Sequence, residues 1–288
     1  MDVPEYTPRA AFESLRGERG LAWEGEGLWR CGSLEGLLAP TVAIVGTRAA
    51  TAYGRRLARA FGRELGAAGC CIVSGLALGI DAAAHEGALQ AGAPTIGVLG
   101  GGHACFFPPR NLDLAERMLA AGGAVLSPWP PGQIAQPWQF LARNAVVAAL
   151  ADAVVVIEAP ARSGALNTAG WAAPRIPVLA VPGDVDRRHV AGCHALIRDG
   201  ATLARGAADV LEALPSTLAL VSSRAAGVPR DGLAGRLLAA LRGGEAEIDD
   251  LVDALGEPAP QLLAELTILE LEGAVERCGA SRFTCSSG

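Results

Sequence analysis

Three turns of this sequence combine glycine, small hydroxyl residues and one arginine, a set suited to binding an anion. The residues concerned are Gly46, Thr47, Arg48, Gly75, Gly79, Ser163, Gly164 and Thr168. Glycine lets a ligand approach the backbone, and the N–H groups that open a following helix attract negative charge. A guanidinium forks onto phosphate oxygens. The turns therefore favour a phosphate-like anion, and the open alternative is that the glycines only make tight turns and Arg48 is solvated.

A fourth group, Phe140, Arg143 and Asn144, opens an apolar helix. It follows the proline-rich segment 127–139, for which we expect a loop. An aromatic ring stacks on a nucleobase, and an arginine holds a phosphate. This group therefore fits a nucleic-acid contact. The residues alone leave the alternative that Phe140 is a core residue and that Arg143 is a surface ion-pair partner.

Several other kinds of site are not indicated. The turn after the first apolar run reads GTRAAT and lacks the G-x-G-x-x-G fingerprint of dinucleotide binding. His103, Cys105, Cys193 and His194 have the spacing of no common zinc site. The seven cysteines form no C-x-x-C pair, which is typical of reduced thiols in the cytosol. We therefore expect neither a cofactor nor a metal ion.

Short apolar runs alternate with helical patterns over residues 41–213. The predicted strands are Val42–Val45, Cys70–Val73, Thr95–Leu99, Ala124–Leu126, Ala153–Ile157, Val178–Val181 and Ala201–Leu203. Such alternation predicts an α/β fold, an open parallel sheet with helices on both faces. Each glycine turn then lies at the carboxyl end of a strand, which is where ligands bind in sheets of this kind.

Composition divides the chain into four parts: a lead-in (1–40) with one short strand expected at 27–32, the sheet domain (41–213), a linker (214–230) and a tail (231–288). The tail shows three helical stretches and two short strands, the pattern of a small winged helix. Its third stretch, 261–272, carries glutamates and no arginine, whereas a DNA-reading helix needs basic residues. We expect this tail to contact protein.

Charge is uneven along the chain. All 24 basic residues are arginine, and the net charge is −6. Residues 1–40 carry −3, residues 41–212 carry +2 and residues 213–288 carry −5, so the centre tolerates an anionic ligand best. The N-terminus is polar and no apolar run is long enough to span a bilayer. We expect a cytoplasmic protein that does not bind a membrane.

A series of motifs across residues 42–205 resembles the DNA-processing protein A family (DprA, also called Smf). The motifs are VAIVGTRAATAYG, IVSGLALGIDAAAHEGAL, GGG…FFPPRN, FLARNAVVAAL, VVVIEAPARSGALNTA, VLAVPGD and GCHALIRDGA. The resemblance implies a Rossmann-like sheet domain, a winged-helix domain and binding of single-stranded DNA without sequence preference. It also implies a homodimer through the sheet domain, protection of incoming DNA and its delivery to RecA recombinase during natural transformation. Single-strand-binding protein is a further candidate partner, and no catalytic reaction is implied.

The resemblance also assigns roles by motif position. Arg48 matches a phosphate-contacting arginine, the segment 140–144 matches one that lines the DNA pocket, and Asp81 belongs to the same turn motif as Gly75 and Gly79. Three departures stand out. Ala145 replaces a frequent second arginine, Ala165 stands in SGALNTA where serine or threonine is usual, and His194 stands where asparagine is usual. These departures and the absence of lysine imply a less positive pocket.

Two other functions remain open. One is a nucleoside monophosphate hydrolase on a related fold. Such enzymes use a glycine-rich turn and a nearby glutamate, and only Gly100–Gly102 and Glu158 resemble these. No glutamate follows these glycines at the spacing that such enzymes use. The other is a paralogue that keeps the fold and has lost DNA binding, as Ala145 suggests. We expect a binding protein and not an enzyme.

Overall fold

The computed structural model describes residues 3–19, 23–215, 233–241, 246–271, 275–278 and 282–285. The chain divides into two compact units, Met1–Ser222 and Ser223–Gly288, and each is described by itself. Residues 216–230 of the expected linker lie outside the described residues.

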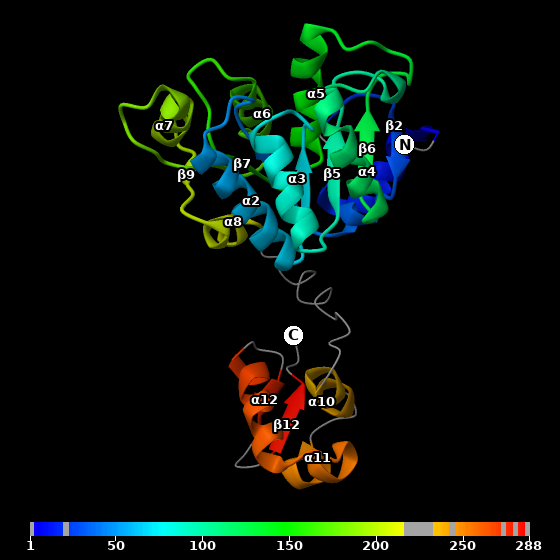
Figure 1. Cartoon of the computed structure of the whole chain (residues 1–288), viewed down its shortest axis with the longest axis vertical. Coiled ribbons are helices and arrows are strands. Elements are labelled where there is room, and N and C mark those ends of the chain that lie inside the picture. Colours follow the sequence, from blue (N-terminus) through cyan, green and yellow to red (C-terminus); the bar gives the residue numbers. More distant parts are fainter. Residues whose placement is uncertain are drawn as a thin grey trace. The chain divides into compact units, whose positions relative to one another are not determined.

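The larger unit is built on a nine-stranded sheet with the order β1-β2-β6-β5-β4-β3-β7-β8-β9 (Figure 1). The strands are β1 (Glu5–Pro8), β2 (Gly27–Gly32), β3 (Thr41–Val45), β4 (Cys71–Ser74), β5 (Thr95–Val98), β6 (Ala124–Ser127), β7 (Ala153–Val156), β8 (Val178–Ala180) and β9 (Thr202–Leu203). Strands β3 to β9 pair in parallel, and β1 and β2 add an antiparallel edge. The Rossmann-like α/β prediction is confirmed, with each parallel strand placed within one residue at either end.

Helices cover both faces of this sheet because successive strand side chains point to opposite sides. Val42 and Ile44 of β3 pack with α2 (Ala52–Ala67) and α3 (Ile80–Gln90). Ala43 and Val45 pack with α5 (Pro137–Ala149) and α6 (Gly164–Ala172) on the other face. Both faces are therefore buried, and this is why the strands read as continuous apolar runs.

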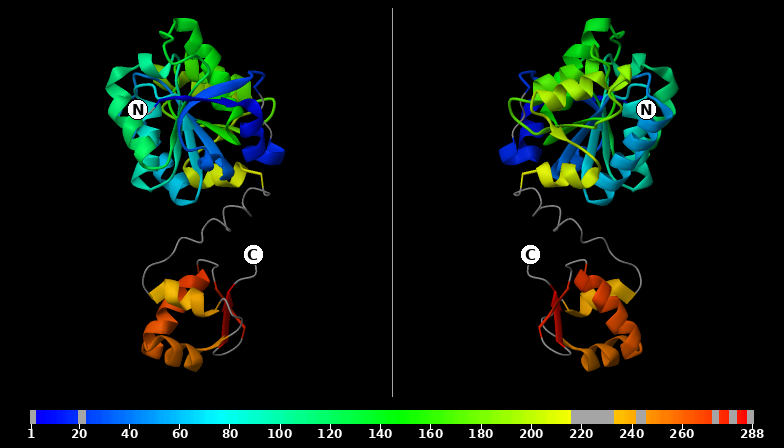
Figure 2. Two further views of the ribbon diagram at one scale, coloured as in Figure 1. Left: turned by 90° about the vertical axis from the view of Figure 1, so that its right-hand side faces the viewer. Right: turned by 90° about the vertical axis from the view of Figure 1, so that its left-hand side faces the viewer.

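The remaining helices of this unit extend the same two layers (Figures 1 and 2). On the side of α2 and α3 lie α4 (Leu112–Ala120) and α8 (Ala207–Ala213). On the side of α5 and α6 lie α1 (Arg9–Arg16) and α7 (Ala191–Arg198). The order of the strands reverses at β3, which has β4 on one side and β7 on the other. The carboxyl ends of β3, β4 and β7 therefore meet at the point where open α/β sheets form a crevice.

The first forty residues contribute more to the sheet than the sequence suggests, because β1, α1 and β2 all belong to it. Buried charges attach this segment to the sheet. The Arg16 guanidinium donates to Asp152 Oδ1 at 2.9 Å, and Arg19 donates to Asp152 Oδ2 at 3.0 Å. The same Oδ2 atom accepts the N–H of Thr41 at 2.8 Å. These partners are far apart in sequence, so hydrophobic periodicity does not reveal them.

The smaller unit has the winged-helix architecture that was predicted. Its helices are α10 (Leu233–Leu241), α11 (Ile248–Leu255) and α12 (Ala259–Leu271). Its sheet has the order β10 (Ala246–Glu247), β12 (Arg282–Cys285) and β11 (Val275–Arg277). Leucines of all three helices bury Phe283 of β12 in one core. The turn expected at Gly279-Ala280 lies outside the described residues.

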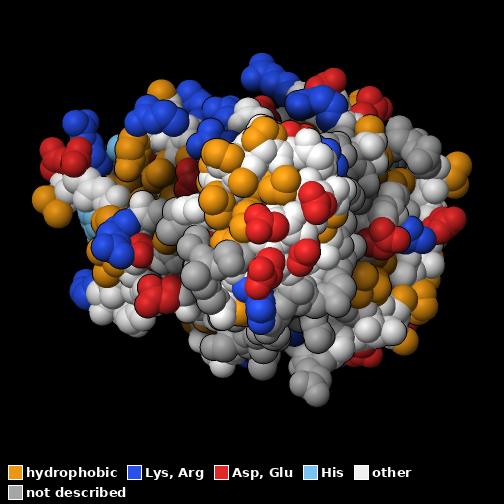
Figure 3. Space-filling model, turned by 90° about the horizontal axis from the view of Figure 1, so that it is seen from below, with side chains coloured by type: hydrophobic (Ala, Val, Ile, Leu, Met, Phe, Trp, Pro, Cys, Tyr) orange, Lys and Arg blue, Asp and Glu red, His pale blue; other side chains and the backbone are white. Residues whose placement is uncertain are grey.

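The surface of this unit is acidic and apolar. Asp249, Asp250 and Asp253 of α11 are exposed, as are Leu263 and Ile268 of α12. Figure 3 views the chain from below and shows acidic and hydrophobic side chains mingled at the centre of that face. Helix α12 has no arginine among its described side chains. It is therefore poorly suited to bind the phosphate backbone of DNA.

Removing the buried carboxylate should destabilise the larger unit. Asp152→Ala leaves the buried Arg16 guanidinium and the half-buried Arg19 guanidinium without this carboxylate, which costs about 3–5 kcal/mol. Urea unfolding followed by tryptophan fluorescence measures this, because all five tryptophans precede residue 172. The control is Asp113→Ala, which removes an exposed ion pair with Arg117 and should cost less than about 1 kcal/mol. Equal free energies of unfolding for the two variants would contradict the structural role of Asp152.

Candidate functional site

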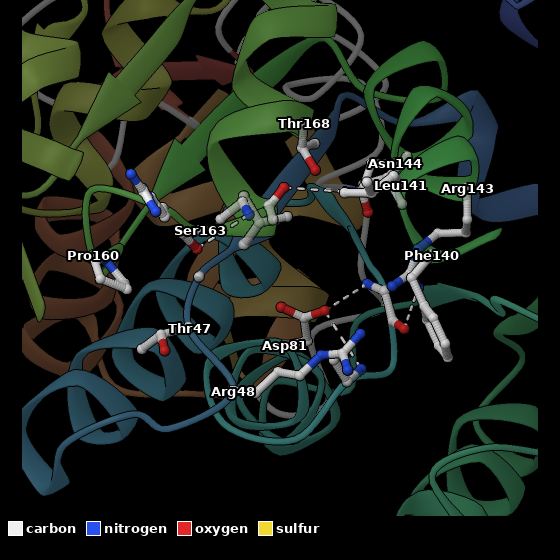
Figure 4. Close-up of a pocket in the computed structure, with 18 of the residues that line it drawn as sticks. Thr47, Arg48, Asp81, Phe140, Leu141, Arg143, Asn144, Pro160, Ser163 and Thr168 are labelled. Atoms are coloured by element: carbon white, nitrogen blue, oxygen red, sulfur yellow. Dashed lines mark hydrogen bonds between the residues drawn. The ribbon is translucent and has the colours of Figure 1, made fainter. Parts of the chain in front are cut away.

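A pocket of about 530 Å³ lies at the carboxyl edge of the sheet, where β3 and β7 end (Figure 4). The turns after β3 and β4, the first turns of α5 and the turn before α6 line it. All but one of the residues predicted for the site line this pocket. They are Gly46, Thr47, Arg48, Gly75, Phe140, Arg143, Asn144, Ser163, Gly164 and Thr168.

Gly79 is the exception, and its place in the site is corrected. It caps the start of α3 with a φ of 87°, a conformation that glycine adopts without strain. A Cβ atom there would overlap the backbone carbonyls of Thr47 and Arg48. The next residue, Ile80, donates its N–H to the Thr47 carbonyl at 3.3 Å. Gly79 therefore lets the turns after β3 and β4 pack together and does not line the pocket.

One side of α5 forms a wall of the pocket. Phe140, Arg143, Asn144 and Val147 all line it, at the i, i+3, i+4, i+7 spacing that places side chains on one helix face. The helix begins at Pro137, so the expectation of a loop up to residue 139 is wrong for its last three residues. Proline suits the first position of a helix because no intrahelical partner exists there for its missing N–H.

Arg143 is a buried structural cation. Only 3% of this residue is exposed, and its guanidinium donates to the carbonyls of Gly75 and Val98, at the ends of β4 and β5. The interpretation as a surface ion-pair partner is therefore wrong. Burial lowers the pKa of Arg143 to about 10, and the nearby Asp81 carboxylate opposes this shift. Arg143 consequently remains charged at neutral pH beneath the pocket.

Asp81 is the buried carboxylate that faces this cation. Its Oδ2 atom accepts the N–H groups of Gly75 at 3.1 Å and Ala77 at 3.4 Å. Burial raises the pKa of Asp81, whereas Arg143 and the two N–H groups lower it. The carboxylate thus shapes the turn after β4 and lies at the floor of the pocket, which Arg143 also lines.

The pocket mouth combines a cation with aromatic rings. Arg48 is exposed, and its Cζ atom lies 4.8 Å from the centroid of the Phe140 ring. The Phe140 ring also meets Phe107 edge-on, with centroids 5.9 Å apart. Phe140 is half-buried and lines the pocket, so its interpretation as a core residue is wrong. A Cβ atom at Gly100 would overlap the Phe140 ring, which explains glycine at that position.

The N-terminus of α6 forms the opposite wall. Ser163 caps this helix by accepting the N–H of Ala165 at 3.3 Å. Asn144 Nδ2 donates to the Gly164 carbonyl at 3.0 Å and thereby holds the turn against α5. Arg162, one residue before the cap, is exposed and also lines the pocket. The sequence prediction omitted Arg162, although it adjoins residues that were named.

Glu158, the carboxylate considered for hydrolysis, is engaged elsewhere. It is 1% exposed and accepts the N–H of Thr51 at 2.9 Å, together with the Thr51 hydroxyl. It therefore fixes the start of α2 to the end of β7, and it is not among the described residues that line the pocket. This position is a structural one.

The described part of the chain contains no candidate metal site. Its residues contain no cluster of three or more histidines, cysteines or acidic residues able to hold a metal ion. His194, the departure from the family pattern, bonds through Nε2 to the Gly183 carbonyl at 2.9 Å. Within the described residues, every helix is too short or too polar to span a bilayer.

Comparison with known proteins identifies the family. Residues 22–215 match the model of the DNA recombination-mediator protein A family, and residues 221–280 match the DprA winged helix domain. The chain belongs to the DprA/Smf family. Its relatives include the putative DNA processing protein DprA of Mycobacterium tuberculosis, which is 40% identical over 261 residues, 86% of this chain and 66% of that protein. Protein Smf of Escherichia coli is 35% identical over 254 residues, 84% of this chain and 67% of that protein.

Two solved DprA structures share the fold. DprA from Streptococcus pneumoniae superposes with a TM-score of 0.62 at 39% identity, over 66% of this chain and 67% of that chain. DNA processing protein A from Helicobacter pylori, solved to give insight into its single-stranded DNA binding mode, has a TM-score of 0.61 at 27% identity, over 73% and 94%. This chain spans about two thirds of the length of the Mycobacterium tuberculosis DprA relative.

Substitution of Arg143 should reveal its structural role. Arg143→Met keeps the length of the side chain but leaves the buried Gly75 and Val98 carbonyls without their donor, which costs about 1–3 kcal/mol of unfolding free energy. The matched control is Arg48→Met, because Arg48 is exposed and its replacement should change stability by no more than about 0.5 kcal/mol. Urea unfolding measures both. An Arg143 variant as stable as the control would refute the structural assignment.

Proposed function

We propose that this protein binds single-stranded DNA in the pocket between α5 and α6 and takes part in DNA processing as a binding protein. The observation that carries the proposal is the exposed Arg48 guanidinium over the Phe140 ring, opposite the N-terminus of α6. Proteins that bind single strands combine an aromatic ring, on which a base stacks, with positively charged groups that contact the phosphates.

The phosphate contacts come from three sources. Arg48 and Arg162 are exposed cations on the pocket wall, and the backbone N–H groups at Ser163 and Gly164 open a helix towards it. Asp81 is the single acidic residue among the described lining residues, and Arg143 balances it. The pocket therefore attracts anions, and a guanidinium matches phosphate geometry.

The base contact is independent of sequence. Phe140 presents a ring, and every base has a stacking face, so binding requires no particular base. The exposed guanidinium and ring are both present, which favours retained binding over a paralogue that has lost it. Ala145 is half-buried and is not among the described residues that line the pocket. An alanine in place of the family's arginine at this position therefore removes no charge from the described pocket lining.

We propose no catalytic reaction, cofactor or metal ion for this chain. The hydrolase alternative needs a carboxylate beside the substrate, and both Glu158 oxygens serve Thr51 at the start of α2. No specific observation favours hydrolysis.

The wider role follows from family membership and remains a proposal for this chain. We infer a cytoplasmic protein that protects incoming DNA during natural transformation, forms a homodimer through the sheet domain at 41–213 and loads RecA recombinase. Single-strand-binding protein is a further candidate partner. The tail at 231–288, which follows the linker at 214–230, is proposed to contact protein. Its exposed aspartates and its apolar α12 residues, Leu263 and Ile268, support this.

Arg48→Ala tests the phosphate contact in titrations of labelled oligo-dT against duplex DNA of equal length. We expect the wild type to prefer the single strand and to weaken as salt rises, because phosphate contacts release counterions. Arg48→Ala should lose about 1.5–3 kcal/mol of binding and reduce the slope of log K against log salt by about 0.7. The control, Arg117→Ala on α4, should bind as the wild type does. A salt-independent wild type, or an unchanged Arg48 variant, would refute the proposed site.

Phe140 should contribute through stacking alone. Phe140→Ala is expected to lose about 1–3 kcal/mol of affinity for oligo-dT with an unchanged salt slope, since no phosphate contact is removed. Phe140→Trp should restore most of the affinity because an aromatic face suffices. Thermal denaturation of each variant serves as the control for folding. If the affinity per folded molecule of Phe140→Ala equalled that of the wild type, the stacking role would be excluded.

A further inference from the structure

A further exposed aromatic residue, outside the pocket lining, lies on the first turn of α2. Tyr53 is 51% exposed, and α2 begins at Ala52 with Thr51 as its cap. Because α2 follows β3 directly, its first turn stands at the same edge of the sheet as the pocket. Four residues lie between Arg48 and Tyr53, so their Cα atoms are at most about 19 Å apart, five steps of about 3.8 Å.

Tyr53 repeats the arrangement seen at the pocket mouth. The Arg56 guanidinium lies over the Tyr53 ring at 5.3 Å from its centroid, as that of Arg48 lies over Phe140 at 4.8 Å. Residues 49–52 connect Arg48 of the first pair to Tyr53 of the second. Each pair offers a nucleotide the same two contacts, an aromatic ring for a base and a planar cation for a phosphate or a second base.

The charge of α2 is strongly positive on this side. The helix holds four arginines and one glutamate. Arg59 pairs with Glu86 and Arg63 with Glu64, but in the described part of the chain no acidic side chain pairs with Arg55 or Arg56. Both are exposed. A basic surface therefore continues from Arg48 at the pocket rim onto the first turn of α2.

We propose that Tyr53 and Arg56 form a second contact for single-stranded DNA, which receives the part of the strand that leaves the pocket past Arg48. The inference rests on the proposed function of the pocket. The contact is independent of sequence, because it consists of a ring face and a cation. It serves only strands long enough to reach it, so affinity depends on length beyond what the pocket itself holds.

The test uses the full chain and two oligo-dT lengths, about 4 and about 16 nucleotides, the limits of common single-strand site sizes. Fluorescence anisotropy should show that Tyr53→Ala weakens binding of the longer strand about fivefold or more, the smallest effect expected of one stacked base. The affinity for the short strand should not change. Tyr53→Phe should bind both strands as the wild type does, since it keeps the ring. Arg56→Ala should lower the salt slope for the longer strand by about 0.7.

Arg63→Ala is the matched control, since it removes the same charge from the same helix about 10 Å, two turns, further from the pocket. It should leave both affinities unchanged. Unchanged binding of the longer strand by Tyr53→Ala and Arg56→Ala would overturn the inference. So would an equal loss with Arg63→Ala, or an equal loss on both lengths. A wild type that binds neither strand would instead refute the proposed function of the pocket.

Discussion

A buried guanidinium holds the walls of the pocket together. Arg143 projects from α5 and bonds to the carbonyls at the ends of β4 and β5, while Asp81 of α3 binds the N–H groups of the turn after β4. Opposite charges that are withdrawn from water interact strongly, and either one alone would be costly to bury. The bonds of Arg143 fix α5 against the ends of β4 and β5, and those of Asp81 fix the start of α3 against the turn after β4. The Arg143 guanidinium is engaged with these carbonyls, so a ligand meets chiefly the exposed Arg48 and Arg162.

Packing of side chains from α5 and α3 explains three glycines at the strand ends, of which Gly46 and Gly75 were expected to admit a ligand. A Cβ atom at Gly75 would overlap the Arg143 guanidinium, and one at Gly100 would overlap the Phe140 ring. These glycines accommodate side chains of α5 that press onto the strand ends. At Gly46, a Cβ atom would meet Ile80 of α3 and the Glu158 carbonyl. The turns are tight because the protein itself fills the space beside them, and this packing shapes the walls that a ligand then meets.

The positions of the strand ends could be read from the sequence, and they predicted the parallel sheet and most of the pocket because both depend on local patterns. An apolar run followed by glycine reveals a buried strand and its carboxyl end, and all such ends share one edge. Roles that depend on distant partners were not predictable. Nothing near Arg16 in sequence indicates that it pairs with Asp152. Likewise, nothing near Glu158 indicates that it accepts hydrogen bonds from Thr51, the cap of α2. The start of α5 was misplaced for a local reason, since proline is excluded from helix interiors but favoured at their first position.

The absence of lysine changes the kind of binding surface that this chain builds. A lysine is a compact point charge, whereas a guanidinium is planar and stacks on rings. Here two of the exposed arginines, Arg48 and Arg56, lie over Phe140 and Tyr53, which holds each of these cations and its ring in a defined relation before a ligand arrives. Ordering long side chains on binding costs affinity, and this arrangement reduces that cost. Arg48 and Arg56, each placed over a ring, therefore add pre-organised geometry to the charge that the exposed Arg55 and Arg162 also supply.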